Sequence, residues 1–347
     1  MKKNNRNNRH LKRKGKLFKA IFIQLFLICI IIVIIKGSFH LTHTAVDDLK
    51  NYAFKIITPP KITTQIETSH LSSSKKEKAG ENELSLLNTA KKQLYSKSAV
   101  LVRLEDQKIL LEKNSDKIIY PASLTKIMTA IVAIENMKDL NETILLSSDL
   151  FPSLYEEDAS MAGFLPMEAV RAIDLLYGVL LPSGAECCLG LADFISGSED
   201  DFVNLMNDKA AALGMTSTHF TNSTGLNNSN HYTTAKDLSK LLLYALQNGT
   251  FREIFTSQKH STASTKLHPD GITVYSTLFH KITDPNFSGG SILGGKTGYT
   301  SKAGLCLATL AQKYGKEYIL VTAGADGNHD TEQYNISDAL RIYTSIE

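Results

Sequence analysis

Three patterns of apolar and polar positions follow one another along the chain. The first is an almost uninterrupted apolar run over 17–35, in which only Lys19 and Gln24 are polar. Residues 36–95 keep no regular period and include a stretch rich in serine and lysine, a composition that cannot bury enough apolar surface to fold alone. A short helix is expected near 82–94 within this linker, and from residue 96 onward the pattern becomes regular. The sequence therefore predicts an apolar segment, a linker and one folded domain over 96–347.

Within the domain, strand patterns stand at both ends and helical patterns in the middle. Alternating apolar positions predict two strands, over 98–104 and 108–112. Helical spacing predicts a helix from Ser123 to near Asn136. Further helices are predicted near 167–180, 185–197, 199–213 and 234–247, then strands over 292–298, 303–312 and 316–324, and a closing helix over 330–345. This order predicts an α+β fold, in which the first and last strands share one antiparallel sheet and the helices cluster against it.

Charge beside the apolar run predicts its relation to a membrane. Residues 1–16 carry eight Lys and Arg and no acid, whereas only Lys36 follows the run closely. The run of 19 residues is close to the roughly 20 that a helix needs to cross a bilayer. We therefore expect a cytoplasmic N-terminus, a single-pass signal-anchor over 17–35 in the cell membrane, and an extracytoplasmic linker and domain. A cleaved signal peptide is the alternative, although its small-residue cleavage site is poorly met.

The remaining composition narrows the classes of function. The formal charge of +3 includes the eight basic residues of the first segment, so the rest of the chain carries −5. An acidic remainder argues against a nucleic-acid partner. The four cysteines are Cys29, the adjacent Cys187 and Cys188, and Cys306, which form no spaced disulfide framework. We expect the last three to be buried and unpaired, with a Cys187–Cys306 bond as the alternative.

Candidate chemistry begins at Ser123. This serine stands just ahead of an apolar helical pattern, so it is predicted in the first turn of a helix, where the helix dipole favours developing negative charge. Lys126 follows three residues later and therefore shares its face. A lysine with its free pKa of about 10.4 is a poor base. Burial and a neighbouring cation, for which Lys296 is the candidate, can lower that pKa enough for the amine to take a proton from serine.

Two later segments supply further candidates. Ser183 lies in a predicted loop between two helices. Lys296, Thr297 and Gly298 fall on a predicted strand, and at a sheet edge such a segment can bind an extended peptide through its backbone. Gly298 would let the strand approach a ligand closely, because glycine has no side chain.

These elements together resemble a known enzyme family. Ser123-Leu-Thr-Lys126, Ser183-Gly-Ala185 and Lys296-Thr-Gly298 occur in the order of the S-x-x-K, S-x-N and K-T-G motifs of serine penicillin-binding proteins and β-lactamases. The flanking sequences, YPASLTKIMTA, DLLYGVLLPSGAEC and GGKTGYTSKAG, are similar to those of D-alanyl-D-alanine carboxypeptidases. The similarity covers roughly 96–345 and implies a β-lactamase/transpeptidase-like fold.

The resemblance also implies roles for individual residues. Ser123 would be the nucleophile, Lys126 its base and Ser183 a hydroxyl that relays a proton. Lys296 and Thr297 would bind the terminal carboxylate of the substrate beside Gly298, and the N–H groups of Ser123 and Tyr299 would form the oxyanion hole. No cofactor or metal is implied.

The implied function is that of a membrane-anchored serine D,D-carboxypeptidase. It would remove the C-terminal D-alanine from peptidoglycan stem peptides, in precursors or in the mature wall, through an acyl-enzyme. β-Lactams would be covalent inhibitors. Because the reaction removes the dipeptide that glycopeptide antibiotics grip, an accessory role in resistance to them is a further expectation.

One departure from the motifs keeps alternatives open. Ala185 stands where the family has asparagine, and we expect Glu186, a water or a shifted backbone to compensate. A β-lactamase is the nearest alternative, but the glutamate that activates the deacylating water is missing from 216–228, which contains no acid. A penicillin-sensing receptor that stays acylated is the other, although such sensors usually have more membrane helices.

Overall fold

The computed structural model describes residues 82–347, and only these are discussed below. The predicted basic segment, the signal-anchor over 17–35 and most of the linker lie outside the described residues. No helix within 82–347 is both long and apolar enough to cross a bilayer.

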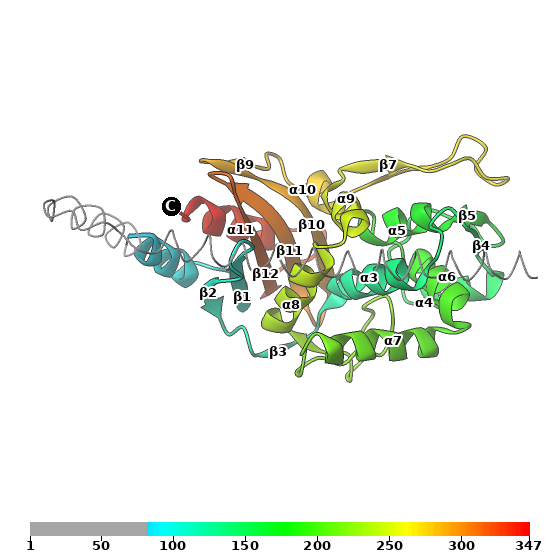
Figure 1. Ribbon diagram of the computed structural model, residues 1–347, viewed down its shortest axis with the longest axis horizontal. Helices are drawn as coiled ribbons and strands as arrows, with labels where there is room; N and C mark the ends of the chain where they lie inside the picture. The colour runs from blue at the N-terminus through cyan, green and yellow to red at the C-terminus, as the bar shows by residue number, and fades with distance from the viewer. Residues whose placement is uncertain (1–81) are drawn as a thin grey trace, which may run out of the picture. The chain divides into compact units, whose positions relative to one another are not determined.

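A six-stranded sheet forms one part of the domain (Figure 1). Its strands lie in the order β2, β1, β12, β11, β10 and β9, and every neighbouring pair is antiparallel. Their bounds are β1 Ser98–Arg103, β2 Ile109–Lys113, β9 Asn286–Phe287, β10 Gly290–Thr300, β11 Gly304–Lys313 and β12 Lys316–Ala325. Because β1 pairs with β12 along its full length, the prediction that strands from the two ends share one sheet is confirmed.

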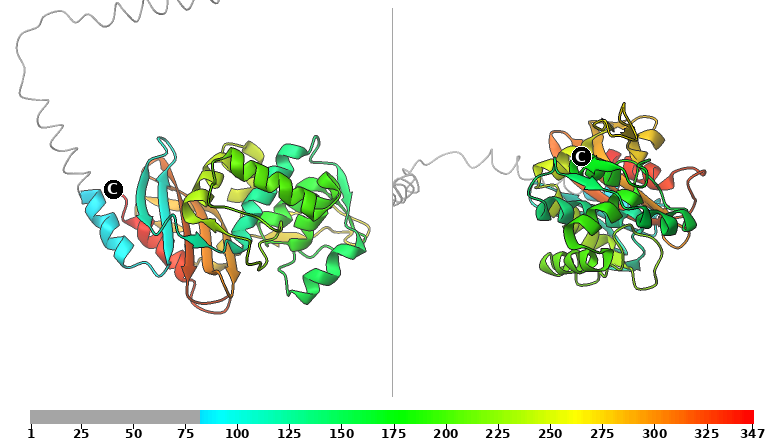
Figure 2. Two further views of the ribbon diagram at one scale, coloured as in Figure 1. Left: turned by 90° about the horizontal axis from the view of Figure 1, so that it is seen from below. Right: turned by 90° about the vertical axis from the view of Figure 1, so that its right-hand side faces the viewer.

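Helices cover both faces of this sheet, as Figure 2 shows. Successive residues of a strand point to opposite faces, so Val100 and Val102 pack in one apolar core and Ala99 and Leu101 in the other. The first core joins the sheet to the central helical cluster: α3 Lys126–Asn136, α5 Ala172–Leu180, α6 Ala185–Ser196, α7 Glu199–Ala212, α8 Ala235–Ala245 and α9 Gly249–Thr256. The second core lies under α10 Thr277–Lys281 and α11 Tyr334–Thr344.

Capping residues fix the ends of several of these helices. The Ser198 hydroxyl accepts from the N–H of Asp201 at the start of α7, and the Thr234 hydroxyl accepts from the N–H of Asp237 at the start of α8. α6 ends at Ser196 and is followed by Gly197, whose φ of 77° is the left-handed conformation common after a helix. These short-range signals explain why the predicted helices begin and end close to where the structure has them.

Residues ahead of β1 also pack on the domain. Residues 82–92 are helical, and Leu87 and Leu94 are buried in the second core. The backbone N–H groups of Tyr95 and Ser96 donate to the carboxylate of Asp338 on α11. The packed part of the chain therefore includes residues that the sequence assigned to the linker.

Short elements account for the differences from the predicted pattern. The helix predicted over 167–180 begins only at Ala172, because 169–171 instead form β5, which pairs with β4. Such a strand is determined by its partner rather than by its own pattern. The short elements that the sequence did not predict are β3 Ile118–Ile119, β4 Thr143–Leu145, η2 Ser148–Leu150, α4 Phe151–Glu156, β5 Ala169–Arg171, β6 Thr233–Thr234, α9 Gly249–Thr256, β7 Lys259–Ser261, β8 Thr273–Tyr275, α10 Thr277–Lys281 and β9 Asn286–Phe287.

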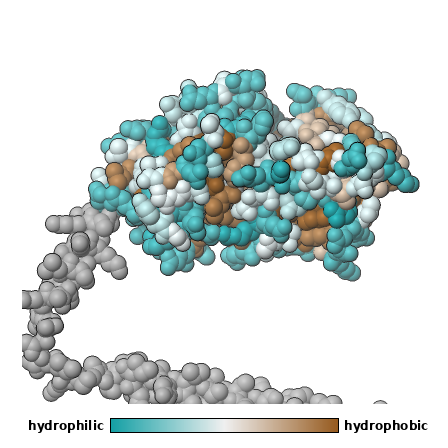
Figure 3. All heavy atoms as spheres, turned by 90° about the horizontal axis from the view of Figure 1, so that it is seen from above, coloured by the Kyte–Doolittle hydropathy of each residue, from teal (hydrophilic) through white to brown (hydrophobic). Residues whose placement is uncertain are grey.

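The three described cysteines lie inside the domain, and its surface is mostly polar (Figure 3). Cys187, Cys188 and Cys306 are buried and unpaired, as expected from their spacing. The surface is mostly polar, with apolar residues showing in several separate areas (Figure 3).

Candidate active site

The first two candidate residues meet at the start of a helix. Ser123 lies in the 3₁₀ turn η1, Ala122–Thr125, which leads directly into α3. Lys126 is the first residue of α3, and its Nζ lies 3.4 Å from Ser123 Oγ. The same Nζ donates to the backbone carbonyl of Thr224 at 2.6 Å. The side-chain nitrogen of Lys126 thus contacts both the Ser123 hydroxyl and a backbone carbonyl.

Both lysines of the motifs are buried, and burial controls their protonation. Lys126 is 3% exposed, and burial lowers its pKa, against an opposing effect of the Glu186 carboxyl. Burial lowers the pKa of Lys296 still more strongly, and the nearby charge of Lys126 lowers it further. The predicted repulsion between the two lysines therefore lowers the pKa of Lys296. The pKa of Lys126 lies below its usual value because of burial.

The Ser183 hydroxyl contacts Lys296, and the backbone of Ser183 has a left-handed conformation. Lys296 Nζ donates to Ser183 Oγ at 2.9 Å and to the carbonyl of Thr297 at 2.8 Å. Ser183 has a φ of 71°, in the left-handed region that non-glycine residues rarely occupy. Such strain, held by the surrounding structure, is common where a side chain must point into a site.

Strand β10 passes very close to Ser123. A Cβ atom at Gly298 would lie 3.1 Å from the backbone nitrogen of Ser123 and 3.3 Å from the Cβ of Ala122. Glycine therefore permits the approach of β10 to η1. Among the described residues, β9 pairs with this edge of β10 only at Gly290 and Ser291. Within 82–347 this edge of β10 consequently has no strand partner at 296–299, and such an edge can bind an extended peptide.

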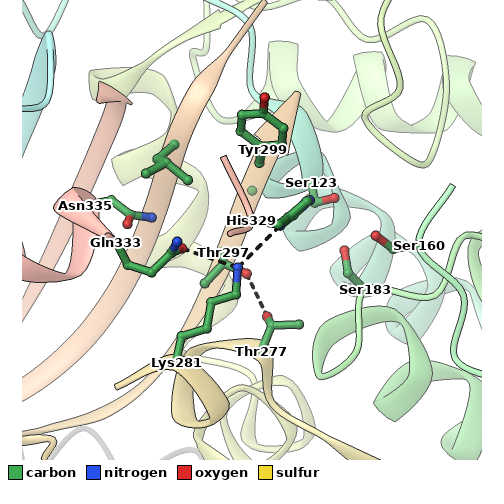
Figure 4. A pocket seen from close by; sticks show the side chains of 12 residues that line it. Ser123, Ser160, Ser183, Thr277, Lys281, Thr297, Tyr299, His329, Gln333 and Asn335 are labelled. Carbon is green, nitrogen blue, oxygen red and sulfur yellow. Dashed lines mark hydrogen bonds between the residues drawn. The ribbon is translucent and has the colours of Figure 1, made fainter. Parts of the chain in front are cut away.

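Two cavities meet at Ser123. The first, of about 270 Å³, is shown in Figure 4, and the second has about 250 Å³. Both are lined by Ser123, Ser160, Tyr299 and His329. The first is otherwise lined by Ser183, Thr277, Lys281, Thr297, Gly298, Leu305, Gln333 and Asn335. The second includes Lys126, Ala185, Thr224 and the carboxylates of Glu157 and Asp158.

The structure therefore brings the three motifs together. The cavity-lining residues among the seven predicted are Ser123, Lys126, Ser183, Thr297, Gly298 and Tyr299. Lys296 is fully buried and lines neither cavity, and its Nζ is hydrogen-bonded to Ser183 Oγ. Its contact with substrate and the oxyanion hole at Ser123 and Tyr299 stay predictions.

Sequence reasoning missed several cavity-lining residues. Ser160, Thr277, Lys281 and His329 lie outside the three motifs and come from separate loops and a short helix. The Thr277 hydroxyl lies 2.6 Å from the Thr297 hydroxyl, and both residues line the first cavity. No local pattern in the sequence signals such positions.

Ala185, the departure from the second motif, lies near a backbone contact of Lys126. Ala185 lines the second cavity, and the second hydrogen-bond partner of Lys126 is the Thr224 carbonyl. The Glu186 carboxylate instead accepts from the N–H groups of Ala162 and Gly163 at 2.7 and 2.9 Å. The Glu186 carboxylate is thus engaged with the backbone of 162–163, and compensation for Ala185 stays a prediction.

The loop that carries this carbonyl is fixed from two sides. The Glu199 carboxylate accepts from the N–H of Ser223 at 2.7 Å. His231 Nδ1 accepts from the N–H of Thr221, and its Nε2 lies 2.8 Å from the Thr125 hydroxyl. Burial lowers the pKa of His231 to about 4, so at neutral pH the ring is uncharged and donates from Nε2. The loop thus holds its carbonyl against Lys126 through buried contacts.

Gly225 supplies a test of this placement. A Cβ at Gly225, whose φ is 84°, would lie 2.0 Å from the Ala122 carbonyl oxygen, whereas at Gly214, with a φ of 66°, it would meet nothing within 4 Å. We expect Gly214→Ala to cost about 1 kcal/mol of stability through backbone strain alone. Gly225→Ala should cost at least about 2 kcal/mol more, because it adds a clash. Urea unfolding of both variants measures the difference, and equal losses would contradict the close contact.

The sequence of this chain is similar to those of known proteins. The model of a family described as D-alanyl-D-alanine carboxypeptidase matches residues 86–327. D-Alanyl-D-alanine carboxypeptidase DacF of Bacillus subtilis is 34% identical over 66% of this chain, and DacC of Escherichia coli is 30% identical over 70%. The matches span 57% and 59% of those two proteins. A D-alanyl-D-alanine endopeptidase of Escherichia coli is 29% identical over 74% of the chain and 78% of its own length.

Solved structures share the fold. The Streptomyces K15 DD-transpeptidase superimposes with a TM-score of 0.65 and 26% identity, covering 73% of this chain and 97% of that one. A D-alanyl-D-alanine carboxypeptidase from Mycobacterium tuberculosis, 24% identical, gives 0.62 over 73% and 92%. The predicted β-lactamase/transpeptidase-like fold is confirmed for the described residues.

Proposed function

This chain belongs to the D-alanyl-D-alanine carboxypeptidase family, and we propose that it is a serine hydrolase that removes the C-terminal D-alanine from peptidoglycan pentapeptides. One observation carries the proposal: Lys126 Nζ lies 3.4 Å from Ser123 Oγ, at the meeting point of two cavities that Ser183 and Thr297 also help to line. A hydroxyl, a desolvated amine and a binding strand in this arrangement are the components of acyl transfer.

Acylation begins with proton removal from Ser123. The neutral amine of Lys126 accepts the proton of the hydroxyl as Oγ attacks the carbonyl carbon of the penultimate D-alanine. The tetrahedral intermediate then breaks its C–N bond, and the departing amine takes up a proton relayed through the Ser183 hydroxyl. Free D-alanine leaves, and the shortened peptide remains esterified to Ser123. Water attacks this ester and releases the peptide with a new carboxylate, which restores the enzyme.

The first cavity suits the leaving D-alanine. Its terminal carboxylate would bind the hydroxyls of Thr297 and Thr277, which lie together, and the ammonium of Lys281. Lys296 lines neither cavity and would act indirectly, by holding the Ser183 hydroxyl in place through a hydrogen bond. The developing oxyanion would accept from the N–H groups of Ser123 and Tyr299, each donor lowering the barrier by about 2.7–4 kcal/mol.

β-Lactams test the function, because they acylate the same serine. We expect the purified protein to release D-alanine through many turnovers, and benzylpenicillin to leave a lasting adduct that peptide mapping by mass spectrometry locates at Ser123. An adduct that hydrolyses at the rate of D-alanine release would favour a β-lactamase. A lasting adduct without D-alanine release would favour a penicillin-sensing receptor.

Membrane attachment and physiological role are further parts of the proposal. The apolar run over 17–35 and the basic residues before it support a signal-anchor that holds the domain outside the cell membrane. Protease digestion of the domain in intact spheroplasts tests this orientation. An accessory role in glycopeptide resistance follows from the same reaction, and a lower tolerance of glycopeptides in a strain carrying Ser123→Ala would support it.

A further inference from the structure

A third cavity lies against the leaving-group side of the active site. It has about 610 Å³ and opens between the segment after α10 and the start of α11, lined among others by Asp284, Asn286 and Ile336. Lys281 and Gln333 line both this cavity and the first one, so their side chains form the wall between the two.

This wall is held in place by polar contacts. Lys281 is the last residue of α10, and its Nζ donates to Gln333 Oε1 at 3.3 Å and to His329 Nδ1 at 3.3 Å (Figure 4). Both acceptors are neutral groups of the segment between β12 and α11. The side chain thus links α10 to the segment before α11.

The charge of the wall faces the substrate. None of the ion pairs within residues 82–347 includes Lys281, so its ammonium has no carboxylate partner there. Burial lowers the pKa of Lys281, and the charge of Asp330 opposes this effect. A half-buried ammonium without a counter-ion favours an incoming carboxylate.

We propose that Lys281 determines the specificity of this site for a chain end: held by Gln333 and His329, it closes the leaving-group side and admits only a single residue with a free carboxylate. This inference rests on the proposed function and says which of its substrates are cleaved.

The chemistry of the two substrate classes makes the distinction sharp. A pentapeptide end and a cross-link present the same D-alanyl carbonyl, and both give the same acyl-enzyme on Ser123. They differ in the departing amine, which belongs to free D-alanine in the first and to a residue that carries a further peptide in the second. The longer leaving group would have to continue past Lys281 into the third cavity. With the wall in place, the enzyme is therefore an exopeptidase.

Three variants separate the volume of the wall from its charge. Lys281→Arg keeps both, Lys281→Met keeps the length without the charge, and Lys281→Ala removes both. Each purified protein is given a muropeptide with a pentapeptide end and a cross-linked tetrapeptide dimer, and the products are separated by liquid chromatography. Melting temperature and acylation by benzylpenicillin show that each variant is folded with a reactive Ser123.

Wild type and Lys281→Arg should cleave the pentapeptide and leave the dimer intact. Lys281→Met should raise KM for the pentapeptide about 10- to 100-fold, as expected for the loss of a charged hydrogen bond, and still spare the dimer. Lys281→Ala should lose the same affinity, and its ratio of dimer to pentapeptide cleavage should rise at least about tenfold. Gln333→Ala, which frees the lysine, should raise the ratio less and provides the test if Lys281→Ala does not fold.

Two results would overturn the inference alone: a wild-type enzyme that cleaves both substrates equally, or an unchanged ratio in Lys281→Ala and Gln333→Ala. Absence of D-alanine release from the wild-type protein would instead remove the proposed function, and this inference with it.

Discussion

Replacing Ser123 with alanine should abolish both D-alanine release from a pentapeptide and covalent labelling by benzylpenicillin. The hydroxyl that Lys126 approaches would be gone. No nucleophile could then add to the carbonyl carbon, and no oxyanion would form. Loss of a nucleophile that acts as one unit with its base typically lowers kcat on the order of 10⁴-fold or more. Release is measured by chromatography of free D-alanine, and labelling by the mass of the intact protein.

Ser153→Ala is the matched control for this change. Ser153 is exposed on α4 and lines neither cavity at Ser123, so its loss should leave the melting temperature, D-alanine release and labelling unchanged. Persistent labelling of Ser123→Ala would contradict the assignment, and peptide mapping would then show whether Ser160 or Ser183 carries the adduct.

Lys126→Arg should reduce the rate of acylation about 10²- to 10⁴-fold, although it keeps a cation at the same place. The proposed proton transfer from Ser123 needs the neutral amine of Lys126, and arginine stays protonated at all accessible pH values. Burial lowers the pKa of Lys126, so the neutral form is present above that lowered pKa. In the wild type, acylation by benzylpenicillin should therefore rise with pH through that pKa and then level off. Stopped-flow rates between about pH 5 and 10 give the profile.

Lys302→Arg is the corresponding control, because Lys302 is exposed and lines neither cavity at Ser123. Its acylation rate should equal that of the wild type. A wild-type rate that falls as pH increases, or an arginine variant of unchanged rate, would show that Lys126 is not the base.

The regular part of the fold could be predicted because its signals are local. Alternating residues such as Val100 and Leu101 face different cores, and Ser198 and Gly197 mark a helix start and a helix end. The strand at 169–171 could not be predicted, since it depends on pairing with β4, which the sequence did not suggest.

The same distinction applies to the site. Ser123, Lys126 and Ser183 stand in motifs whose spacing is visible along the chain, and the structure places all three at the cavities. Lys281 and His329 are 48 residues apart and meet only because α10 and the segment before α11 lie against the same sheet. Contacts of this kind depend on tertiary packing, for which the sequence carries no short-range signal.

The pairing of β1 with β12 has a consequence for biogenesis. Of the strands of this sheet, β1 is synthesised first and its neighbour β12 last. The sheet therefore stays incomplete until nearly the whole domain has been synthesised. Contacts between such distant segments form slowly, because the intervening chain must first be brought together. A chain with this strand order completes the core between sheet and helices, to which β12 contributes Ile319, Val321 and Ala323, only near the end of synthesis.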